Sequence, residues 1–395
     1  MRIVLFYSEV ESFNYFSDVL AAQLEARGHE TFILDLTNPG SGGVHSFDYF
    51  IPFISKKVDM AICFDGLGIL DDVYIDIWNE HQAEIVDILM DPPIRFHGVF
   101  KKHPRNYHLF CCDRDHMEYV RKYFHEEVSD IVFMPHAGTL PAEDDPVIPY
   151  AKRSYDILFS GTYYRYQDEF MKLKTVFSVE PNTKLYSFYE QMFSNLTEDS
   201  CLTLDQAFHL TLDQCKWEVS EDMLKLMLTF TEPVDWAVRM YYREQVITAL
   251  AEAGLKIHLL GRGWENYPLI DRPNVYHIDE RIPFAETLPY MADAKICLNV
   301  FPWFKSGSHD RIFNTLLQHS VPLTDYSHWV ADHFTDGVDI ALYDLAHLEQ
   351  LPGIAESLLK DSAFAEAMIQ RGYEKVSRNY TWSNCVDRIF EVICG

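Results

Sequence analysis

The stretch RIVLFYSEVESFNYFSDVLAAQLEARGHETFILDL, residues 2–36, decides the fold of this chain. Its apolar run at residues 2–7 predicts a short buried strand, and the run at residues 31–36 predicts a second one. A loop at residues 8–14 leads into a helical pattern with one apolar face, formed by Phe16, Val19, Leu20 and Leu24. A strand, a helix and a strand in this order form a βαβ unit, which favours a parallel sheet with helices on both faces.

The same alternation of strands and helices continues along both halves of the chain. In the first half, the apolar runs that predict further strands are residues 60–64, 85–90, 107–111 and 131–134. In the second half, they are residues 155–159, 256–260, 275–278, 296–300 and 321–324. A chain of 395 residues exceeds the size at which one core keeps growing. We therefore predict an α/β fold with two Rossmann-like domains, residues 1–145 and 154–380, and a central cleft between them.

Three segments interrupt this alternation. Residues 143–153, EDDPVIPYAKR, contain two prolines and a shift in charge, and they are predicted to link the domains. Residues 167–235 are helical in pattern and lack obvious strands, so they are predicted to form a helical insertion in the second domain. The chain is again helical from residue 362, with a break near residues 379–382. We expect the C-terminal helix, residues 381–395, to cross back to the first domain.

The charge balance restricts the class of partner. There are 33 Lys and Arg residues against 60 Asp and Glu residues, which gives a formal net charge of -27. Such a surface repels nucleic acid phosphates and anionic lipid, so we expect no nucleic acid partner and no role at a membrane surface. If an anion such as a nucleotide diphosphate binds, a local group of cations and backbone N–H donors must overcome this field.

The cysteines and the first residues bear on metals and on location. The eight cysteines show no CxxC pair and no Cys/His ligand spacing, so buried free thiols are expected, with no zinc site. Paired aspartates occur at Asp71 and Asp144, but outside the context of a DxD metal motif. We expect neither a metal nor a cofactor.

The N-terminus reads as a strand rather than a signal peptide, and no apolar run approaches the length of a membrane span. A cytoplasmic location is therefore expected, with no transmembrane segment.

The segment KSGSHDRIFNTLLQHSVPLTD, residues 305–325, supplies the local cations. Ser308 and the residues before it suit a loop and an N-cap, so a helix is predicted to begin at His309 or Asp310. The first N–H groups of this helix are free, and its N-terminus is the positive end of the helix dipole. The positively charged or titratable side chains around this point are Lys305, His309 and Arg311. This pattern predicts an anion-binding site.

The polar face of the same helix allows two interpretations. Arg311, Asn314 and Gln318 are spaced at i, i+3 and i+7, which places them on one face of the helix. The opposite face, predicted to lie toward the sheet, is formed by Ile312, Phe313, Leu316 and Leu317. The polar face either contacts a ligand or is the solvated side of an ordinary capped helix.

Two turns that contain glycine follow strands of the second domain. The glycines of GRGW, residues 261–264, allow close approach of the backbone, and Trp264 is expected to stack on a base or to close the cleft. Such glycines are also ordinary turn residues. At the end of the first strand, residues 160–162 (SGT) offer backbone and hydroxyl donors to a phosphate, and Arg165 is expected to assist them.

Three residues of the first domain are candidates for catalysis. Asp91 lies just beyond a predicted strand in LMDPPIRFHG, and His97 follows six residues later. His136 lies beyond the last strand before the linker, in MPHAG. Loops at the carboxyl ends of strands carry function in open α/β sheets, so all three side chains are expected to face the cleft. The alternative for each histidine is an ordinary core or surface position.

Several motifs, in order, resemble a known family. They are LLGRGW (259–264), SGSHDRIFNTLLQHSVPLTD (306–325), the YD pair at Tyr343 and Asp344, and GYEKVSRNYTW (372–382). Together they are similar to the C-terminal domain of the spore-maturation CgeB-like glycosyltransferases, which is related to the large retaining GT-B group that uses nucleotide sugars. The resemblance covers residues 255–385 well and residues 1–150 only in general pattern. It implies a GT-B fold that holds a sugar nucleotide on the C-terminal domain.

The resemblance also implies roles for particular residues. Arg311 and the loop before it would face the donor diphosphate, and Asn314 stands where many relatives have a glutamate that holds the ribose hydroxyls. Ser306 stands where the other glutamate of the larger group lies. The predicted donor-binding residues are thus Gly161, Thr162, Arg165, Gly263, Trp264, Ser308, His309, Arg311 and Asn314.

The expected function is transfer of a sugar from a nucleotide-diphosphate donor, such as a UDP-sugar, to an acceptor hydroxyl. The enzyme would be of the hexosyltransferase type and independent of metal, its acceptor a glycan, a protein or a small molecule, and the chain a possible homo-oligomer. The resemblance implies retention of anomeric configuration, in which the departing phosphate takes the acceptor's proton. If the configuration is inverted instead, Asp91 or His97 is the predicted base. Two alternatives are a sugar-nucleotide epimerase and a catalytically silent protein that binds a sugar nucleotide.

Overall fold

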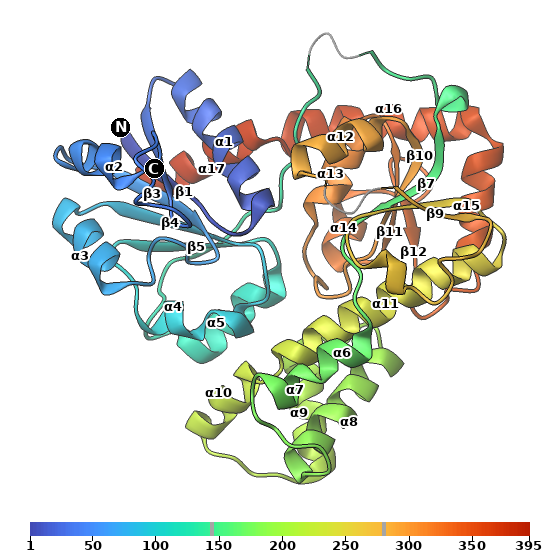
Figure 1. Cartoon of the computed structure of the whole chain (residues 1–395), viewed down its shortest axis with the longest axis horizontal. Coiled ribbons are helices and arrows are strands. Elements are labelled where there is room, and N and C mark those ends of the chain that lie inside the picture. The colour runs from blue at the N-terminus through green and yellow to red at the C-terminus, as the bar shows by residue number, and fades with distance from the viewer. Residues whose placement is uncertain (143–145, 279–281) are drawn as a thin grey trace. The chain divides into compact units, whose positions relative to one another are not determined.

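The computed structural model describes residues 1–142, 146–278 and 282–395, and the chain forms two compact units (Figure 1). The first unit consists of Met1–Ala137, Pro283–Ala285 and Asn379–Gly395. The second consists of Gly138–Ile282 and Glu286–Arg378. Residues 143–145 of the predicted linker lie outside the described residues. Each unit contains one six-stranded sheet, and the paired strands of both sheets run parallel.

The first sheet has the strand order β2-β1-β3-β4-β5-β6. Its strands are β1 (Arg2–Tyr7), β2 (Glu30–Asp35), β3 (Met60–Phe64), β4 (Glu84–Leu89), β5 (Tyr107–Cys111) and β6 (Ile131–Phe133). The helices between them are α1 (Glu11–Ala26), α2 (Phe47–Ile54), α3 (Asp72–His81), α4 (His97–Lys101) and α5 (Arg114–Phe124), with the short 3-10 helix η1 (Pro93–Arg95) before α4. The alternating order gives the doubly wound arrangement that the first 36 residues predicted.

Helix α1 begins earlier than its apolar pattern indicated. The predicted loop at residues 8–14 ends at Val10, and Glu11 already belongs to the helix. The side chain of Asn14 accepts a hydrogen bond from the Ser8 N–H at 2.7 Å and donates one to the Ser8 carbonyl at 3.0 Å. Polar residues therefore close the turn that leads into α1, which a search for apolar periodicity does not detect.

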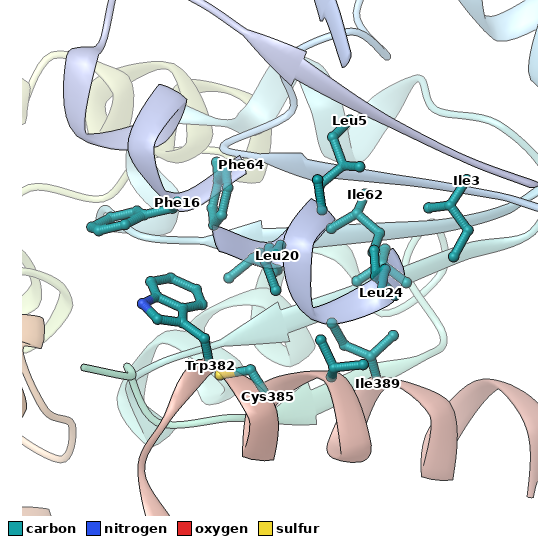
Figure 2. Close-up of a cluster of buried hydrophobic side chains, with 14 of the residues drawn as sticks. Ile3, Leu5, Phe16, Leu20, Leu24, Ile62, Phe64, Trp382, Cys385 and Ile389 are labelled. Carbon is teal, nitrogen blue, oxygen red and sulfur yellow. The ribbon is translucent and has the colours of Figure 1, made fainter. Parts of the chain in front are cut away.

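The core of the first unit combines the two ends of the chain (Figure 2). Helix α17 (Trp382–Cys394) packs on α1, and the ring centroids of Trp382 and Phe16 are 4.8 Å apart. At the rim, Arg27 Nη2 lies 2.8 Å from Asp387 Oδ1. The buried residues that α1, α17 and the strands contribute include Ile3, Leu5, Phe16, Leu20, Leu24, Ile62, Phe64, Trp382, Cys385 and Ile389. The C-terminal helix is thus part of the first unit.

The second sheet has the strand order β12-β11-β10-β7-β8-β9. Its strands are β7 (Tyr155–Ser160), β8 (Ile257–Leu260), β9 (Val275–His277), β10 (Ala294–Asn299), β11 (Val321–Asp325) and β12 (Ala341–Tyr343). The helices that accompany them are α12 (Phe284–Ala292), α13 (Asp310–Leu317), α14 (His328–His333), α15 (Leu351–Lys360) and α16 (Ser362–Asn379). Strand β12 was not predicted, since three residues carry too little pattern.

The insertion between β7 and β8 is helical, and its last helix extends into the sheet region (Figure 1). Its helices are α6 (Tyr166–Phe170), α7 (Lys172–Thr175), α8 (Lys184–Glu198), α9 (Leu204–Cys215), α10 (Glu221–Thr229) and α11 (Glu232–Glu252). Helix α11 contacts α6 and α8 and also β8 and α15. The predicted insertion ended at residue 235, but α11 continues to Glu252 without a break, because its only proline is in the first turn and it contains no glycine. None of the helices within the described residues has the length and apolar character that a membrane span needs.

Candidate anion-binding site

Helix α13 begins at Asp310, where the loop after β10 ends, and its first turn forms the centre of the site. The sequence predicted this start. The residues predicted to face the sheet, Ile312, Phe313, Leu316 and Leu317, are completely buried. Ser308, just before the helix, is also buried. The apolar face fixes α13 against the sheet, and its N-terminus follows the carboxyl end of β10.

His309 caps the helix and adds no free positive charge. Burial lowers the pKa of its imidazole below the ordinary value, so the ring is neutral at pH 7. Its Nδ1 lies 3.2 Å from the N–H of Arg311 and 2.8 Å from Asp310 Oδ1. In one tautomer Nδ1 accepts from the backbone, and in the other it donates to the carboxylate. Either way the ring serves its own helix start, so the expectation that His309 supplies a cation is wrong.

Arg311 does carry a positive charge at this helix start. Its Nη1 donates a hydrogen bond to Asn299 Oδ1 at 2.5 Å, and its guanidinium carbon is 5.5 Å from the centroid of the Phe159 ring. Asn299 ends β10 and is itself held by a bond from its Nδ2 to Thr324 Oγ1 at 2.9 Å. The side chain of Arg311 forms no ion pair with a carboxylate of the described residues. Its hydrogen-bond acceptor and its ring partner are neutral, and the nearby carboxylates of Asp310 and Asp325 stabilise the charge without forming an ion pair with it.

A second arginine, which the sequence analysis did not select, lies beside the same ring. Arg243 belongs to α11 and is only 6% exposed. Its guanidinium carbon is 5.2 Å from the Phe159 centroid, and its Nη1 donates to the carbonyl of Thr162. Helical spacing alone could not identify this residue, because almost every face of α11 is buried and contains charged side chains.

The two glycine turns pack against each other. A Cβ on Gly263, where φ is 83°, would lie 1.9 Å from the Tyr163 carbonyl oxygen, so glycine is required there. A Cβ on Gly261 would lie 2.4 Å from the Gly161 carbonyl oxygen. The close approach of backbone that the sequence predicted is therefore an approach between the two turns. It positions Thr162, whose N–H and hydroxyl make no hydrogen bond with the described part of the chain.

Trp264 supports these turns from inside the core. Its ring is fully buried, and Nε1 donates to the Gly161 carbonyl at 2.9 Å. The ring stacks on Tyr163 with centroids 5.0 Å apart. The prediction that Trp264 stacks on a base or closes the cleft is wrong, because both the ring and its nitrogen are occupied by protein. Arg165, in contrast, is exposed at the start of α6.

Asn314 binds the chain itself. It is 1% exposed, its Oδ1 accepts from the Thr139 N–H at 2.9 Å, and its Nδ2 donates to Asp310 Oδ2 at 3.3 Å. Gln318 Nε2 donates to the Thr139 carbonyl at 3.1 Å. A Cβ on Gly138 would lie 2.8 Å from the Phe313 carbonyl carbon. The segment after β6 thus covers this face of α13, so the face is not solvated, and in this arrangement Asn314 does not offer its amide to a ribose.

Asp325, at the end of β11, is a buried acid near Arg311. Burial raises its pKa to about 7, while hydrogen bonds from the Phe301 N–H to its oxygens, at 3.0 and 3.2 Å, and the charges of Lys305 and Arg311 oppose this shift. It lines a cavity of about 30 Å³ together with Lys305, His328 and Asp344. The sequence analysis did not select Asp325 as a candidate site residue.

The three catalytic candidates all lie in the first unit. Asp91 follows β4 and pairs with Arg95, with Oδ2 and Nη1 3.0 Å apart, and 28% of its side chain is exposed. His97 begins α4 and is buried, with Nε2 2.7 Å from the Tyr119 hydroxyl and its ring 4.8 Å from that of Phe124. His136 is buried as well. For both histidines this geometry favours the ordinary core position over direct contact with substrate.

Comparison with known proteins adds to this geometry. Residues 243–391 match the glycosyl transferase-like family. No curated protein sequence matches the chain. Among solved structures, sucrose-phosphate synthase from Thermosynechococcus elongatus is similar with a TM-score of 0.56 and 11% identity, over 100% of this chain and 99% of that one.

Two further solved structures are similar over the full length of both chains. An alpha-glucosyltransferase in complex with UDP and a 13-mer DNA has a TM-score of 0.57 and 10% identity, over 100% of each chain. WaaG, a glycosyltransferase involved in lipopolysaccharide biosynthesis, has a TM-score of 0.52 and 12% identity, over 100% of each chain. The narrower resemblance to CgeB-like proteins stays a prediction. The chain therefore has the two-domain GT-B fold of glycosyltransferases, and its residues from 243 to 391 are glycosyl transferase-like.

Proposed function

We propose that this protein is a glycosyltransferase that moves a sugar from a nucleoside-diphosphate sugar to an acceptor hydroxyl, with the donor bound to the second unit. One observation carries the proposal. In a chain with a net charge of -27, Arg311 lies at the start of α13, where an amide and an aromatic ring hold it and no carboxylate of the described residues forms an ion pair with it. The glycosyl transferase-like match begins at Arg243 and includes this helix, and a structural neighbour contains UDP, which favours a UDP-sugar as the donor.

The chemistry needs positive potential where the leaving group forms. As the bond between the anomeric carbon and the diphosphate oxygen breaks, negative charge grows on the diphosphate. We propose that this charge is stabilised by charge-assisted hydrogen bonds from the Arg311 guanidinium and from the Thr162 N–H, which makes no hydrogen bond to the described residues. We propose that these groups suffice without a metal. In the retaining course, the acceptor oxygen bonds to the anomeric carbon, and the acceptor proton passes to the departing phosphate.

The proposal is tested by ligand binding and by an arginine variant. A true donor stabilises the folded state by mass action, by about 2.7 kcal/mol at a hundredfold excess over Kd, so a panel of nucleotide sugars screened by thermal unfolding identifies it. Arg311→Ala is expected to weaken binding of the nucleoside diphosphate and to reduce turnover strongly, with an unchanged fold. The matched control is Arg272→Ala, a partly exposed arginine before β9, 3.8 Å from Glu252 Oε1, with the same change in charge. Equal affinity of the Arg311→Ala variant and the wild type in calorimetry would remove the donor site.

A second candidate function rests on Asn314. This position lacks a carboxylate, and its amide is bound to Thr139 and Asp310. A protein that binds a sugar nucleotide without transferring the sugar is consistent with that arrangement. Such a protein would be stabilised by the donor but would neither hydrolyse it nor transfer its sugar to any acceptor, whereas a transferase consumes donor when an acceptor is supplied.

A further inference from the structure

Arg243 is a buried cation whose charge the described residues do not neutralise. Of its three nitrogens, only Nη1 donates a hydrogen bond to an oxygen, the Thr162 carbonyl, and its buried Nε has no hydrogen-bond partner. No carboxylate of the described residues forms an ion pair with it. Arg239, one turn earlier on α11, differs, because its Nη2 lies 2.8 Å from Asp235 Oδ2. Removing an unpaired guanidinium from water is costly, so the fold keeps this one at a cost to its own stability.

A comparison within the chain shows what a purely structural arginine looks like here. Arg153 is 6% exposed, as Arg243 is. Its Nε donates to the Ile148 carbonyl at 3.1 Å, and its Nη1 donates to the Ala294 carbonyl at 2.9 Å and to Ser320 Oγ at 3.0 Å. These bonds occupy Nε and Nη1 and join elements near the amino end of β7. Arg243 has no such set of acceptors, and therefore its position is not explained by structure alone.

Arg243 and Arg311 are close enough to repel each other. Both guanidinium groups lie near the Phe159 ring, at 5.2 and 5.5 Å from its centroid, although they come from helices α11 and α13. Burial, followed by the charges of Arg311 and Arg239, lowers the pKa of Arg243 to about 9. With this pKa, Arg243 is still protonated at pH 7. Two cations beside one ring, neither in an ion pair with a carboxylate of the described residues, suit an anion with more than one acceptor group. The N–H of Thr162, whose carbonyl accepts from Arg243, makes no hydrogen bond to the described part of the chain and offers a further donor.

We propose that Arg243 is a second arm of the donor site, so that Arg243 and Arg311 each bind one phosphoryl group of the leaving diphosphate. The proposal rests on the function proposed above and deepens it, because it makes the site selective for a diphosphate over a monophosphate. It also gives the helical insertion a part in donor binding, since α11 carries Arg243 from the insertion to the carboxyl end of β7.

The test measures selectivity by calorimetry on the full chain, with UDP, UMP and inorganic pyrophosphate as probes. Wild type is expected to bind UDP and pyrophosphate and to bind UMP more weakly. Arg243→Met keeps the apolar stem and removes the charge, and it should weaken UDP and pyrophosphate by about tenfold to a hundredfold while leaving UMP nearly unchanged. Arg243→Lys keeps the charge but lacks the planar guanidinium with its several N–H donors, so an intermediate loss of UDP affinity is expected. This variant replaces the methionine variant in the test if the latter does not fold.

The control is Arg153→Met, which removes an equally buried arginine from the other end of β7. It is expected to lower the Tm without changing the ratio of UDP to UMP affinity. An unchanged ratio in both Arg243 variants overturns the inference and leaves the proposed function intact. Failure of wild type to bind either UDP or pyrophosphate contradicts the proposed function itself.

Discussion

Gly263 illustrates how a single residue holds the site in shape. Its φ is 83°, and a side chain there would meet the Tyr163 carbonyl. Gly263→Ala is therefore expected to destabilise the second unit by more than the left-handed conformation alone costs, which is about 1–2 kcal/mol. Gly254→Ala is the matched control, because Gly254 has a φ of 81° with no atom within 4 Å of its Cβ position. Chemical denaturation of both variants measures the difference in their free energies of unfolding. Equal losses of stability would show that the close contact with the Tyr163 carbonyl adds nothing to the effect of the Gly263 substitution.

Asp325 leads to a prediction about pH. Burial raises its folded pKa to about 7, above the value in the unfolded chain, so the folded state binds more protons between about pH 4 and 7. The free energy of unfolding of the wild type therefore falls as the pH rises through that window. Asp325→Asn does not titrate, so its stability relative to wild type should rise by about 1 kcal/mol per pH unit up to pH 7 and then level off. Denaturation curves across this pH range check the trend, and parallel curves for the two proteins would refute it.

Individual site residues were predictable where the signal was local. The start of α13 and its buried face follow from the sequence between residues 306 and 317, and Arg311 was found in this way. The burial of Asn314 could not be predicted, because Thr139, which donates a hydrogen bond to its side chain, lies 175 residues upstream. Trp264 is buried by a turn 103 residues away. Helical spacing identifies the face of a side chain but not the segment that will cover that face.

At the scale of the element, helix α17 is the clearest case for a test. Trp382 packs on Phe16 and is 5% exposed. Trp382→Ala should cost about 3–5 kcal/mol, the usual range for removing a buried large aromatic side chain. Because α17 belongs to the first unit, amide hydrogen exchange should accelerate in α1 and β1 and stay unchanged in β10 and β11. Phe364→Ala, at a residue of α16 that is 38% exposed, is the control. Uniform acceleration in both units would contradict this assignment.

The elements that the sequence predicted best are the buried strands. The runs at residues 60–64 and 107–111 are strands β3 and β5 with the same limits, since parallel strands covered on both faces are continuous apolar runs. Helix boundaries were less predictable. The start of α1 depends on the side chain of Asn14, and the unbroken course of α11 depends on packing against both the insertion and the sheet. Such boundaries depend on contacts that apolar periodicity does not encode.

At the scale of the whole molecule, the charge distribution bears on the need for metal. The net charge is -27, yet Arg243 and Arg311 lie together beside Phe159. In the proposed mechanism these side chains supply the positive charge that a divalent cation would otherwise provide, so transfer is expected to proceed at the same rate in EDTA. An activity that EDTA removes and Mg²⁺ or Mn²⁺ restores would show that the arginines are insufficient.

The packing of α17 in the first unit has a consequence for synthesis. The ribosome makes residues 1–137 first, but the core around Phe16 includes Trp382, Cys385 and Ile389. Until those last residues leave the exit tunnel, the nascent first unit exposes the apolar surface that α17 will cover. The second unit ends at Arg378, so its residues leave the tunnel before those of α17. The part of the protein that is translated first is therefore finished last, and during that interval a chaperone has an unoccupied hydrophobic surface to bind.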